Sequence, residues 1–359
     1  MFRHKCAALV AWIGVSALVV ATSSLSSTGA SAAPRALAPP QLGFNTYVQD
    51  LCQSDSVWAS DAVGQFTELQ ALGANSIALA FPFYTSSLKS STLFTRRTCG
   101  TNYQTPSPAR LAVAIDEAKA LHLRVFLRPI LNETVLGAEH GWRGTIKPRN
   151  VNEWFRSYFK VLTPYLKLAH RERVNWFAIS TELDSMQTQS NWAWLIASTK
   201  RYYRGPLIFT DTWHPNTVTQ PGTLPGLDAY QGALVPNSAT PTQLLAAWNY
   251  ALNVSDPLPF PISSATIDEV AIVAQDGAYP RPWSWSLDPR YFPFNQYIQA
   301  NWYSMVCSFF REHNLQGVYF WGVWYADGAN ALPQTPSPGL AQEIQPASAA
   351  VIQSCFTGT

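Results

Sequence analysis

The chain has 359 residues, of which 13% are charged and 13% are aromatic, and its formal net charge at pH 7 is +2. This small charge argues against nucleic-acid binding and against an anionic membrane surface, which both select strongly basic proteins. The length is sufficient for one large domain or two ordinary ones, and the 14 tryptophans exceed what a core normally absorbs.

The first 33 residues are predicted to be a secretory signal peptide. A short basic start is followed by an apolar run over residues 7–21 and by small residues that end at Ala33. A membrane-spanning helix needs about 20 apolar residues, so an uncleaved anchor is the less favoured alternative. We therefore expect a secreted, extracellular protein without membrane association after cleavage, in which residues 34–40 form a disordered leader.

From residue 41 to residue 359 the sequence alternates strand-like and helix-like segments, which predicts a parallel α/β sheet. The predicted strands are short apolar runs at 42–46, 76–81, 125–129, 176–181, 207–210, 227–230, 262–266 and 317–321. The predicted helices have apolar residues at helical spacing and cover 55–72, 108–121, 152–173, 192–203, 242–252, 295–313 and 338–354. The segment after the fifth strand shows no convincing helix.

Eight strand signals that alternate with helices favour a single-domain (β/α)8 TIM barrel over residues 41–359. A doubly wound open sheet is the alternative, but no Gly-x-Gly-x-x-Gly sequence follows the first strand. The end of the chain also carries no second domain. The barrel is therefore the predicted fold.

Four cysteines remain after the predicted cleavage, and an even number in an exported protein suggests disulfides. Three pairings are compatible with the sequence. We favour Cys52 with Cys99 and Cys307 with Cys355, because each pair closes a local loop within one half of the chain. Zinc binding is the competing interpretation, but the sequence has no Cys-x-x-Cys spacing and its six histidines are scattered.

In such a barrel, catalytic groups come from the carboxyl ends of the strands and from the loops that follow them. The sequence places acids, one arginine and large aromatics there: Asn45, Phe81, Arg128, Glu182, Asp211, Trp213, Asp228, Tyr230, Glu269 and Trp321. This set suits a neutral polysaccharide better than a phosphate ester, which calls for Gly-rich turns and more basic groups. Glu182 and Glu269 end two well-separated strands, and glycosidic bond cleavage requires such a pair of carboxylates.

Several short motifs occur in an order that is typical of one enzyme family. Residues 141–146 read Gly-Trp-Arg-Gly-Thr-Ile, 179–183 read Ile-Ser-Thr-Glu-Leu, 268–271 read Asp-Glu-Val-Ala and 275–283 read Gln-Asp-Gly-Ala-Tyr-Pro-Arg-Pro-Trp. Over residues 42–330 the sequence resembles glycoside hydrolase family 113, the β-mannanase family of the eightfold-barrel glycosidase clan. It departs from the expected pattern at the end of strand seven, Ile-Asp-Glu-Val, and in strand eight, Tyr-Phe-Trp-Gly-Val-Trp.

The resemblance implies that Glu182 is the general acid/base and Glu269 the nucleophile of a retaining hydrolase. In that mechanism the two carboxyl groups lie about 5–5.5 Å apart, one protonated and one ionised. The residues predicted to bind substrate or to support these acids are Arg128, Trp142, Arg143, Trp213, Asp228, Tyr230, Trp283 and Trp321. Arg128 and Tyr230 are the candidates for hydrogen bonds to the nucleophile. The alternative to these functional roles is structural: Arg128 fills the barrel interior, and the tryptophans pack against the rim.

Two further acids are interpreted as lying outside the reaction. Glu133 follows Asn132 in a dipeptide that imitates the clan's acid/base motif, but it comes one strand too early and is assigned to a loop. Asp268 precedes the predicted nucleophile, so it should point to the opposite side of the strand, away from the crater.

The sequence thus predicts a secreted, monomeric retaining glycoside hydrolase that cleaves a β-linked neutral polysaccharide or oligosaccharide. The favoured substrate is β-1,4-mannan, followed by other β-glycans and cell-wall sugars. We expect no metal and no organic cofactor, because carboxylates supply both proton transfer and covalent catalysis. A carbohydrate-binding barrel without catalysis and a metal-dependent hydrolase are the alternatives, and the scattered histidines argue against the second.

Overall fold

The computed structural model describes residues 39–99 and 104–358, so the predicted signal peptide lies outside the described residues. The strands form one sheet in the order β1-β9-β8-β7-β6-β5-β4-β2-β3, and an additional pairing of β1 with β2 closes it. All pairings are parallel except that of β3 with β2. The predicted (β/α)8 barrel is therefore confirmed.

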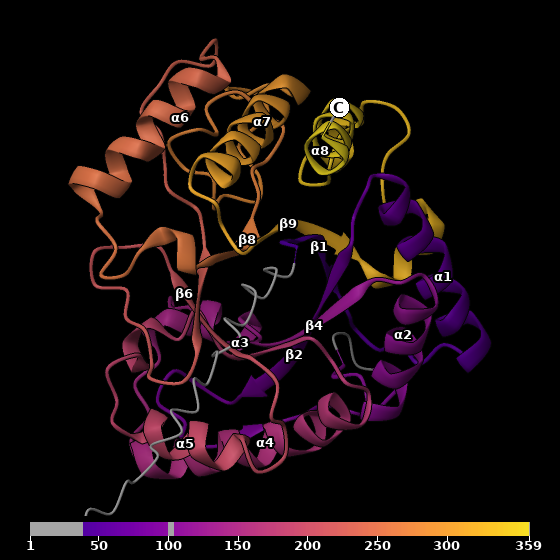
Figure 1. The fold of residues 1–359 in the computed structure, drawn as a ribbon, viewed down its shortest axis with the longest axis vertical. Coiled ribbons are helices and arrows are strands. Elements are labelled where there is room, and N and C mark those ends of the chain that lie inside the picture. The colour runs from indigo at the N-terminus through magenta and orange to yellow at the C-terminus, as the bar shows by residue number, and fades with distance from the viewer. Residues whose placement is uncertain (1–38, 100–103, 359) are drawn as a thin grey trace, which may run out of the picture. The chain divides into compact units, whose positions relative to one another are not determined.

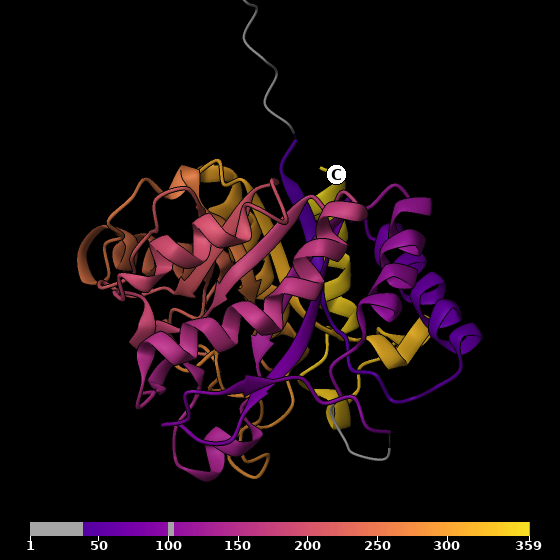
Figure 2. The ribbon, with the colours of Figure 1, turned by 90° about the horizontal axis from the view of Figure 1, so that it is seen from below.

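The elements follow one another around this barrel, with the helices outside the strands (Figures 1 and 2). The strands are β1 (Gln41–Tyr47), β2 (Ser76–Thr85), β3 (Leu93–Phe94), β4 (Arg124–Leu131), β5 (Trp176–Thr181), β6 (Leu207–Thr212), β7 (Leu224–Asp228), β8 (Thr266–Val270) and β9 (Gly317–Trp324). The helices are α1 (Asp55–Ala71), α2 (Pro108–Ala120), α3 (Thr134–Ala138), α4 (Val151–Arg171), α5 (Asn191–Thr199), α6 (Pro241–Tyr250), α7 (Gln296–Glu312) and α8 (Pro346–Thr357). No helix separates β6 from β7.

Polar side chains fix where most of the long helices begin. The side chain before the first turn accepts a hydrogen bond from a backbone N–H of that turn in α1, α2, α4, α6 and α7; these residues are Ser54, Ser107, Asn150, Thr240 and Asn295. Such caps satisfy donors that a helix leaves unpaired at its amino end. The helices then bury their apolar sides against the outer face of the barrel.

Side chains inside the barrel form an apolar layer and a charged layer. Near the amino ends of the strands, the interior is filled by Ala78, Phe126, Ala178, Ile208 and Tyr319. Two residues further along β4, Arg128 also points inward, and it is completely buried. The intervening Leu127 packs into the main core between strands and helices. The barrel interior therefore becomes charged towards the carboxyl ends of its strands.

Two predicted elements begin at least four residues later than expected. Residues 262–264 form a 3-10 turn, and strand β8 is Thr266–Val270, four residues later than predicted. The strand carries two acids, which look like surface residues in the sequence but are buried inside the barrel. The last helix begins at Pro346 instead of residue 338, because residues 338–340 form a separate short turn.

Asp268 and Glu269 both point into the barrel, although alternation along a strand predicted opposite sides for them. The register between β7 and β8 shifts at this point: Leu227 pairs with Ile267, whereas Asp228 pairs with Glu269. An extra residue in one strand of a pair is a β-bulge, and it cancels the alternation locally. Asp268 is completely buried there, and its side chain accepts hydrogen bonds from two threonine hydroxyls, one on β6 and one on β8.

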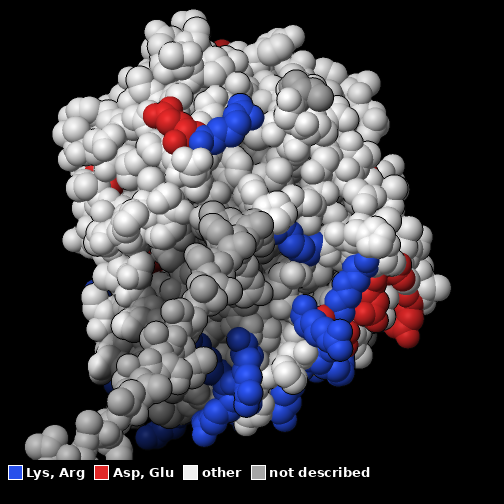
Figure 3. All heavy atoms as spheres, in the orientation of Figure 1, with Lys and Arg blue, Asp and Glu red and all other residues white. Residues whose placement is uncertain are grey.

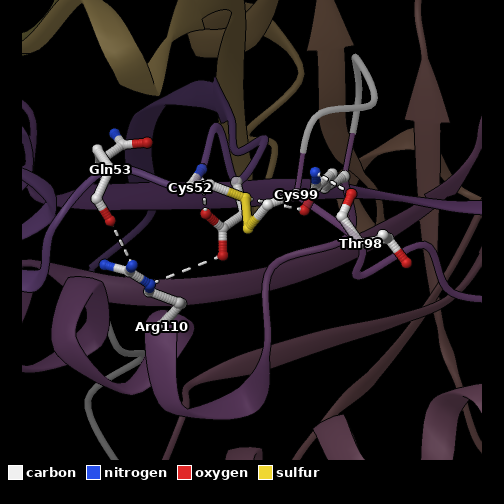
Figure 4. The surroundings of a disulfide bond; sticks show 7 residues. Cys52, Gln53, Thr98, Cys99 and Arg110 are labelled. Atoms are coloured by element: carbon white, nitrogen blue, oxygen red, sulfur yellow. Dashed lines mark hydrogen bonds and ion pairs between the residues drawn. A yellow bond between two sulfur atoms is a disulfide. The ribbon is translucent and has the colours of Figure 1, made fainter.

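Both favoured disulfides are present. Cys52 and Cys99 are joined with their Cα atoms 5.8 Å apart, and Cys307 on α7 is joined to Cys355 on α8 at 5.9 Å. Figure 4 shows Arg110 beside the first disulfide, where its guanidinium donates to the backbone oxygen of Gln53. The first bond therefore anchors the segment before α1 and the second holds the closing helix.

The surface agrees with the small net charge. On the face shown in Figure 3, Lys and Arg gather along one edge beside acidic side chains, and most of the remaining described surface is uncharged. Within residues 39–99 and 104–358, none of the helices combines the length and the apolar character that crossing a bilayer requires.

The Gly226→Ala substitution should destabilise the barrel. A Cβ atom at this position on β7 would lie 2.0 Å from Asp268 Oδ2 and 2.7 Å from Ile208 Cγ2. We expect a loss of about 1–3 kcal/mol in the free energy of unfolding, the usual cost of overpacking a core, measured by urea denaturation. Gly339→Ala is the control, because nothing lies within 4 Å of its Cβ position. Equal stability of the two variants would contradict the close packing inside the barrel.

Candidate active site

A cavity of about 790 Å³ opens at the carboxyl ends of the strands. Its walls come from most strands of the barrel and include Tyr47, Glu133, Trp142, Arg143, Glu182, Trp213, Tyr230, Glu269, Trp283, Trp285, Trp321 and Trp324. Aromatic side chains therefore dominate the walls, and three glutamates face the same space, two of which, Glu182 and Glu269, come from the carboxyl ends of strands. This is the position where barrels of this type carry their catalytic groups.

Glu182 is the first residue after β5, and its backbone has the left-handed conformation, with φ of 49°. This conformation is unfavourable for a residue with a side chain and persists only where surrounding contacts impose it. The Glu182 N–H donates to the Thr210 oxygen at 3.2 Å, which continues the pairing with β6. The turn ends the strand and presents the Glu182 carboxyl group to the cavity, where the residue is 8% exposed.

Arg143 holds the carboxyl group of Glu182, with Nη1 2.7 Å from Oε2. Burial raises the pKa of Glu182 to about 7, against the opposing charge of Arg143 and with the support of the Glu269 charge. A carboxyl group with such a pKa carries a proton for part of the time near neutral pH. It can therefore act both as an acid and as a base.

Glu269 has a different environment, because donors bind both of its oxygens. The Tyr230 hydroxyl donates to Oε1 at 2.7 Å, and Arg128 donates to Oε2. Burial and the neighbouring Glu269 raise the pKa of Tyr230 well above its ordinary value, so this hydroxyl stays protonated as a donor. Two donors, one on β4 and one just after β7, therefore fix the position of this side chain.

Arg128 is the cation of the barrel interior. Its guanidinium also donates to Asp228, so that one fully buried arginine binds two carboxylates. Burial opposes the charge of Arg128, but Asp228 and Glu269 outweigh it and hold the arginine pKa above its ordinary value. Arg128 and Asp228 are not among the residues that line the cavity, and Arg128 contacts Glu269 from within the barrel. Their position supports Glu269 from the side opposite the cavity.

The other predicted substrate-binding residues all line the cavity: Trp142, Arg143, Trp213, Tyr230, Trp283 and Trp321. Trp213 is only 3% exposed, and its indole N–H donates to the Asp256 oxygen at 3.0 Å. It is therefore mainly part of the wall. Trp283, by contrast, is 60% exposed and offers an open face.

Sequence reasoning missed several residues of the cavity, among them Tyr47, Trp285 and Trp324. Trp285 is 52% exposed, and its ring centroid lies 6.1 Å from that of Trp321. The Trp-Ser-Trp sequence at 283–285 was the available signal for Trp285, because one short loop does not readily bury two large aromatic side chains. Glu133, assigned to a loop, precedes α3 and also faces the cavity.

Among the described residues, one group can offer metal ligands, namely Asp184, Asp211 and His214, whose ligand atoms lie within 4.8 Å of one another. Nδ1 of His214 already accepts a hydrogen bond from the Asn216 N–H at 3.0 Å. Burial and the adjacent Asp184 raise the pKa of Asp211 to about 10. This pKa favours a protonated Asp211, a form that binds a cation less well than a carboxylate does.

A closed (β/α)8 barrel whose aromatic cavity receives two differently bound glutamates has the architecture of a glycoside hydrolase. The sequence profile of Glycoside Hydrolase Family 113 matches residues 51–332. The match covers most of the chain, and the protein belongs to this family. It is therefore a glycoside hydrolase, as the sequence motifs predicted.

Solved structures share the fold. A GH113 β-1,4-mannanase in complex is 17% identical, covers 90% of this chain and 100% of its own, and superposes with a TM-score of 0.66. The GH113 β-mannanase AaManA from Alicyclobacillus acidocaldarius is 18% identical over 89% of this chain and 98% of its own, with a TM-score of 0.65. A β-glucuronidase from Ruminococcus gnavus is 12% identical, with 89% and 49% coverage and a TM-score of 0.50. No curated protein sequence matches the chain.

Replacement of Arg128 by methionine should destabilise the protein strongly at neutral pH. The substitution leaves Asp228 and Glu269 as buried carboxylates without their cation, which typically costs about 3–5 kcal/mol. The loss should be smaller at about pH 5 than at about pH 7, because burial raises the pKa of Asp228 well above its ordinary value and a protonated carboxyl group needs no cation. Urea denaturation at both pH values measures the effect.

Arg290→Met is the matched control, since Arg290 pairs with Asp288 on the exposed surface and such pairs contribute little. A loss for Arg128→Met that is the same at both pH values would contradict the assigned charges.

Proposed function

We propose that this hydrolase is a secreted, retaining β-mannanase that cleaves β-1,4-mannan with Glu182 as acid/base and Glu269 as nucleophile. The observation that carries the proposal is the difference between the two acids that face one cavity. Glu182 has a pKa raised to about 7, whereas Glu269 accepts hydrogen bonds from Tyr230 and Arg128. Pairs of carboxyl groups with such different environments divide the acid and nucleophile roles between them.

In the first step, a Glu269 oxygen attacks the anomeric carbon while Glu182 transfers its proton to the glycosidic oxygen. The bond to the leaving sugar breaks, and a covalent glycosyl-enzyme forms. Tyr230 and Arg128 hold the two Glu269 oxygens in place. A fixed carboxylate reaches the anomeric carbon with little loss of entropy at the moment of reaction.

In the second step, Glu182 is ionised and removes a proton from water. The water oxygen attacks the anomeric carbon, the ester bond to Glu269 breaks, and the sugar is released with its original configuration. Arg143 stabilises the carboxylate of Glu182 in this half of the reaction, because its Nη1 lies 2.7 Å from Oε2. The proton taken from water in this step restores the acid form of Glu182.

The choice of mannan is supported by the family and by the two solved β-mannanases with the same fold. The cavity suits an uncharged chain of sugars, because tryptophans form much of its wall and aromatic faces pack against apolar sugar faces. Secretion is supported by two disulfides, which persist in oxidising compartments, together with the predicted signal peptide. The monomeric state stays a prediction.

The Glu269→Ala and Glu182→Ala variants should separate the two roles. Both should lose at least about 10³-fold of the parent turnover of mannan, the scale on which a glycosidase depends on its carboxylates. Azide should restore turnover of an activated aryl β-mannoside in both. Glu182→Ala should yield the β-mannosyl azide and Glu269→Ala the α-mannosyl azide, because azide replaces water in the first variant and the nucleophile in the second.

Nuclear magnetic resonance identifies the anomers, and circular dichroism verifies that both variants are folded. Undiminished turnover of mannan by Glu269→Ala, or inversion of the anomeric configuration by the parent enzyme, would refute the retaining assignment. Hydrolysis of a β-glucan or a galactan in preference to mannan would refute only the substrate.

Removal of the exposed tryptophans at the mouth of the cavity should weaken binding of long chains. Trp283 and Trp285 offer open indole faces on the loop after β8. Each Trp→Ala substitution should raise KM for mannan about fivefold, which corresponds to about 1 kcal/mol of aromatic packing. The effect on kcat should be small and the effect on KM should decrease for shorter oligosaccharides.

Trp194→Ala is the matched control for both variants, because Trp194 is 43% exposed but lies on α5, outside the cavity wall. An equal rise in KM for mannan in this control would show that the loss is unspecific.

A further inference from the structure

Arg143 lies between two carboxylates. Its Nη1 is 2.7 Å from Glu182 Oε2, and its Nε is 3.0 Å from Glu133 Oε1. The same Nε donates to the Leu131 backbone oxygen at 3.1 Å, which fixes the plane of the guanidinium. The Glu133 side chain is 40% exposed, whereas those of Arg143 and Glu182 are 15% and 11% exposed. One cation is therefore shared by an inner and an outer acid.

This contact conflicts with the chemistry of the first step. Glu182 must carry a proton to protonate the leaving oxygen. A guanidinium at hydrogen-bond distance favours the ionised form of a carboxyl group. Burial raises the pKa of Glu182 against this charge. A group that offsets the charge of Arg143 would act in the same direction as burial and favour the protonated acid.

We propose that Glu133 is this group, a positioning residue whose carboxylate draws the charge of Arg143 away from Glu182 and keeps the acid protonated. The inference rests on the proposed function, because it assumes that Glu182 is the proton donor. Glu133 makes no contact with the reacting atoms in this role and acts only through Arg143.

The surroundings of Glu133 favour this role over a structural one. It precedes α3, but its side chain makes no capping hydrogen bond. The Thr134 N–H at that helix end is bound instead by Asn132 Oδ1 at 3.0 Å. Glu133 Oε1 also accepts the Arg143 backbone N–H at 3.4 Å. The carboxylate is thus directed to Arg143, and the short helix does not depend on it.

The charges around Glu182 agree with this assignment. Burial raises the pKa of Glu182 most, Arg143 and Arg128 lower it, and Glu269 and Glu133 raise it, with a result of about 7. Asp211, Asp228 and Tyr230 also lie within electrostatic reach of Glu182, and Tyr47 lies near Arg143 and Glu133. Of these groups, Glu133 is the acid that contacts Arg143 and is open to solvent.

Glu133→Gln tests the inference, because it removes the charge and keeps the shape. Without this charge, Arg143 acts more strongly on Glu182, whose pKa falls. The alkaline limb of the kcat/KM profile should then move to lower pH by about half a unit, a modest shift because the carboxylate is partly exposed. On the alkaline side this shift corresponds to about a threefold loss of kcat/KM. Glu133→Asp, which keeps the charge, should restore the limb towards that of the parent.

Glu139→Gln is the matched control. Glu139 lies just beyond α3 and accepts the Leu88 N–H at 3.0 Å, so the variant removes one charge from the same loop without touching Arg143. Its profile should superpose on that of the parent. Equal shifts in both Gln variants, or no shift in Glu133→Gln, would overturn the proposal.

A second measurement does not depend on turnover. Carbon-13 labelling of the glutamate carboxyl groups, with the Glu182 resonance assigned by its loss in Glu182→Gln, gives the titration of Glu182 directly. The midpoint should be about half a unit lower in Glu133→Gln than in the parent and in Glu139→Gln. If no glycan is hydrolysed, the proposed function fails, while this titration still decides whether Glu133 controls Glu182. An unchanged midpoint would overturn the inference.

Discussion

The buried ion pairs of Arg128 are the interaction on which the rest of the site depends. A lone charge in the barrel interior would be costly, but Arg128 on β4 binds Asp228 at the end of β7 and Glu269 on β8. The two acids share one arginine, and the three groups connect three strands. Removing the arginine would leave its buried partners without a cation, so Glu269, the proposed nucleophile, is held by the same contacts that keep the barrel interior stable.

The two glutamates proposed as catalytic, Glu182 and Glu269, have similar partners but different exposure. Each binds an arginine, and each arginine also binds a second acid: Arg128 has Asp228, and Arg143 has Glu133. Arg128 and Asp228 are completely buried, and the Glu269 side chain is 8% exposed. The outer acid of the Arg143 cluster is 40% exposed and therefore accessible to solvent. A nucleophile needs a constant charge, whereas an acid/base must change its protonation twice in each turnover.

Local departures from regular strand geometry put both acids in place. Glu182 follows β5 and has a left-handed backbone conformation, and a bulge on β8 turns Asp268 and Glu269 to the same side. Regular alternation would have sent one of the two β8 acids outward into the apolar layer beneath the helices. Such departures often occur at catalytic sites, because they aim a side chain that a regular strand would misplace.

The sequence by itself determined the barrel, because eight apolar runs alternate with amphipathic helices, and it favoured the two observed disulfides through their local spacing. Its motifs also predicted Glu182 and Glu269 as a pair of acids, and both line one cavity. Only the tertiary structure decided that Asp268 lies inside the barrel, that Trp285 faces Trp321 and that Glu133 shares Arg143 with Glu182. These features depend on strand register and on loop conformations, which bring residues distant along the chain into contact. Local sequence periodicity does not predict such contacts.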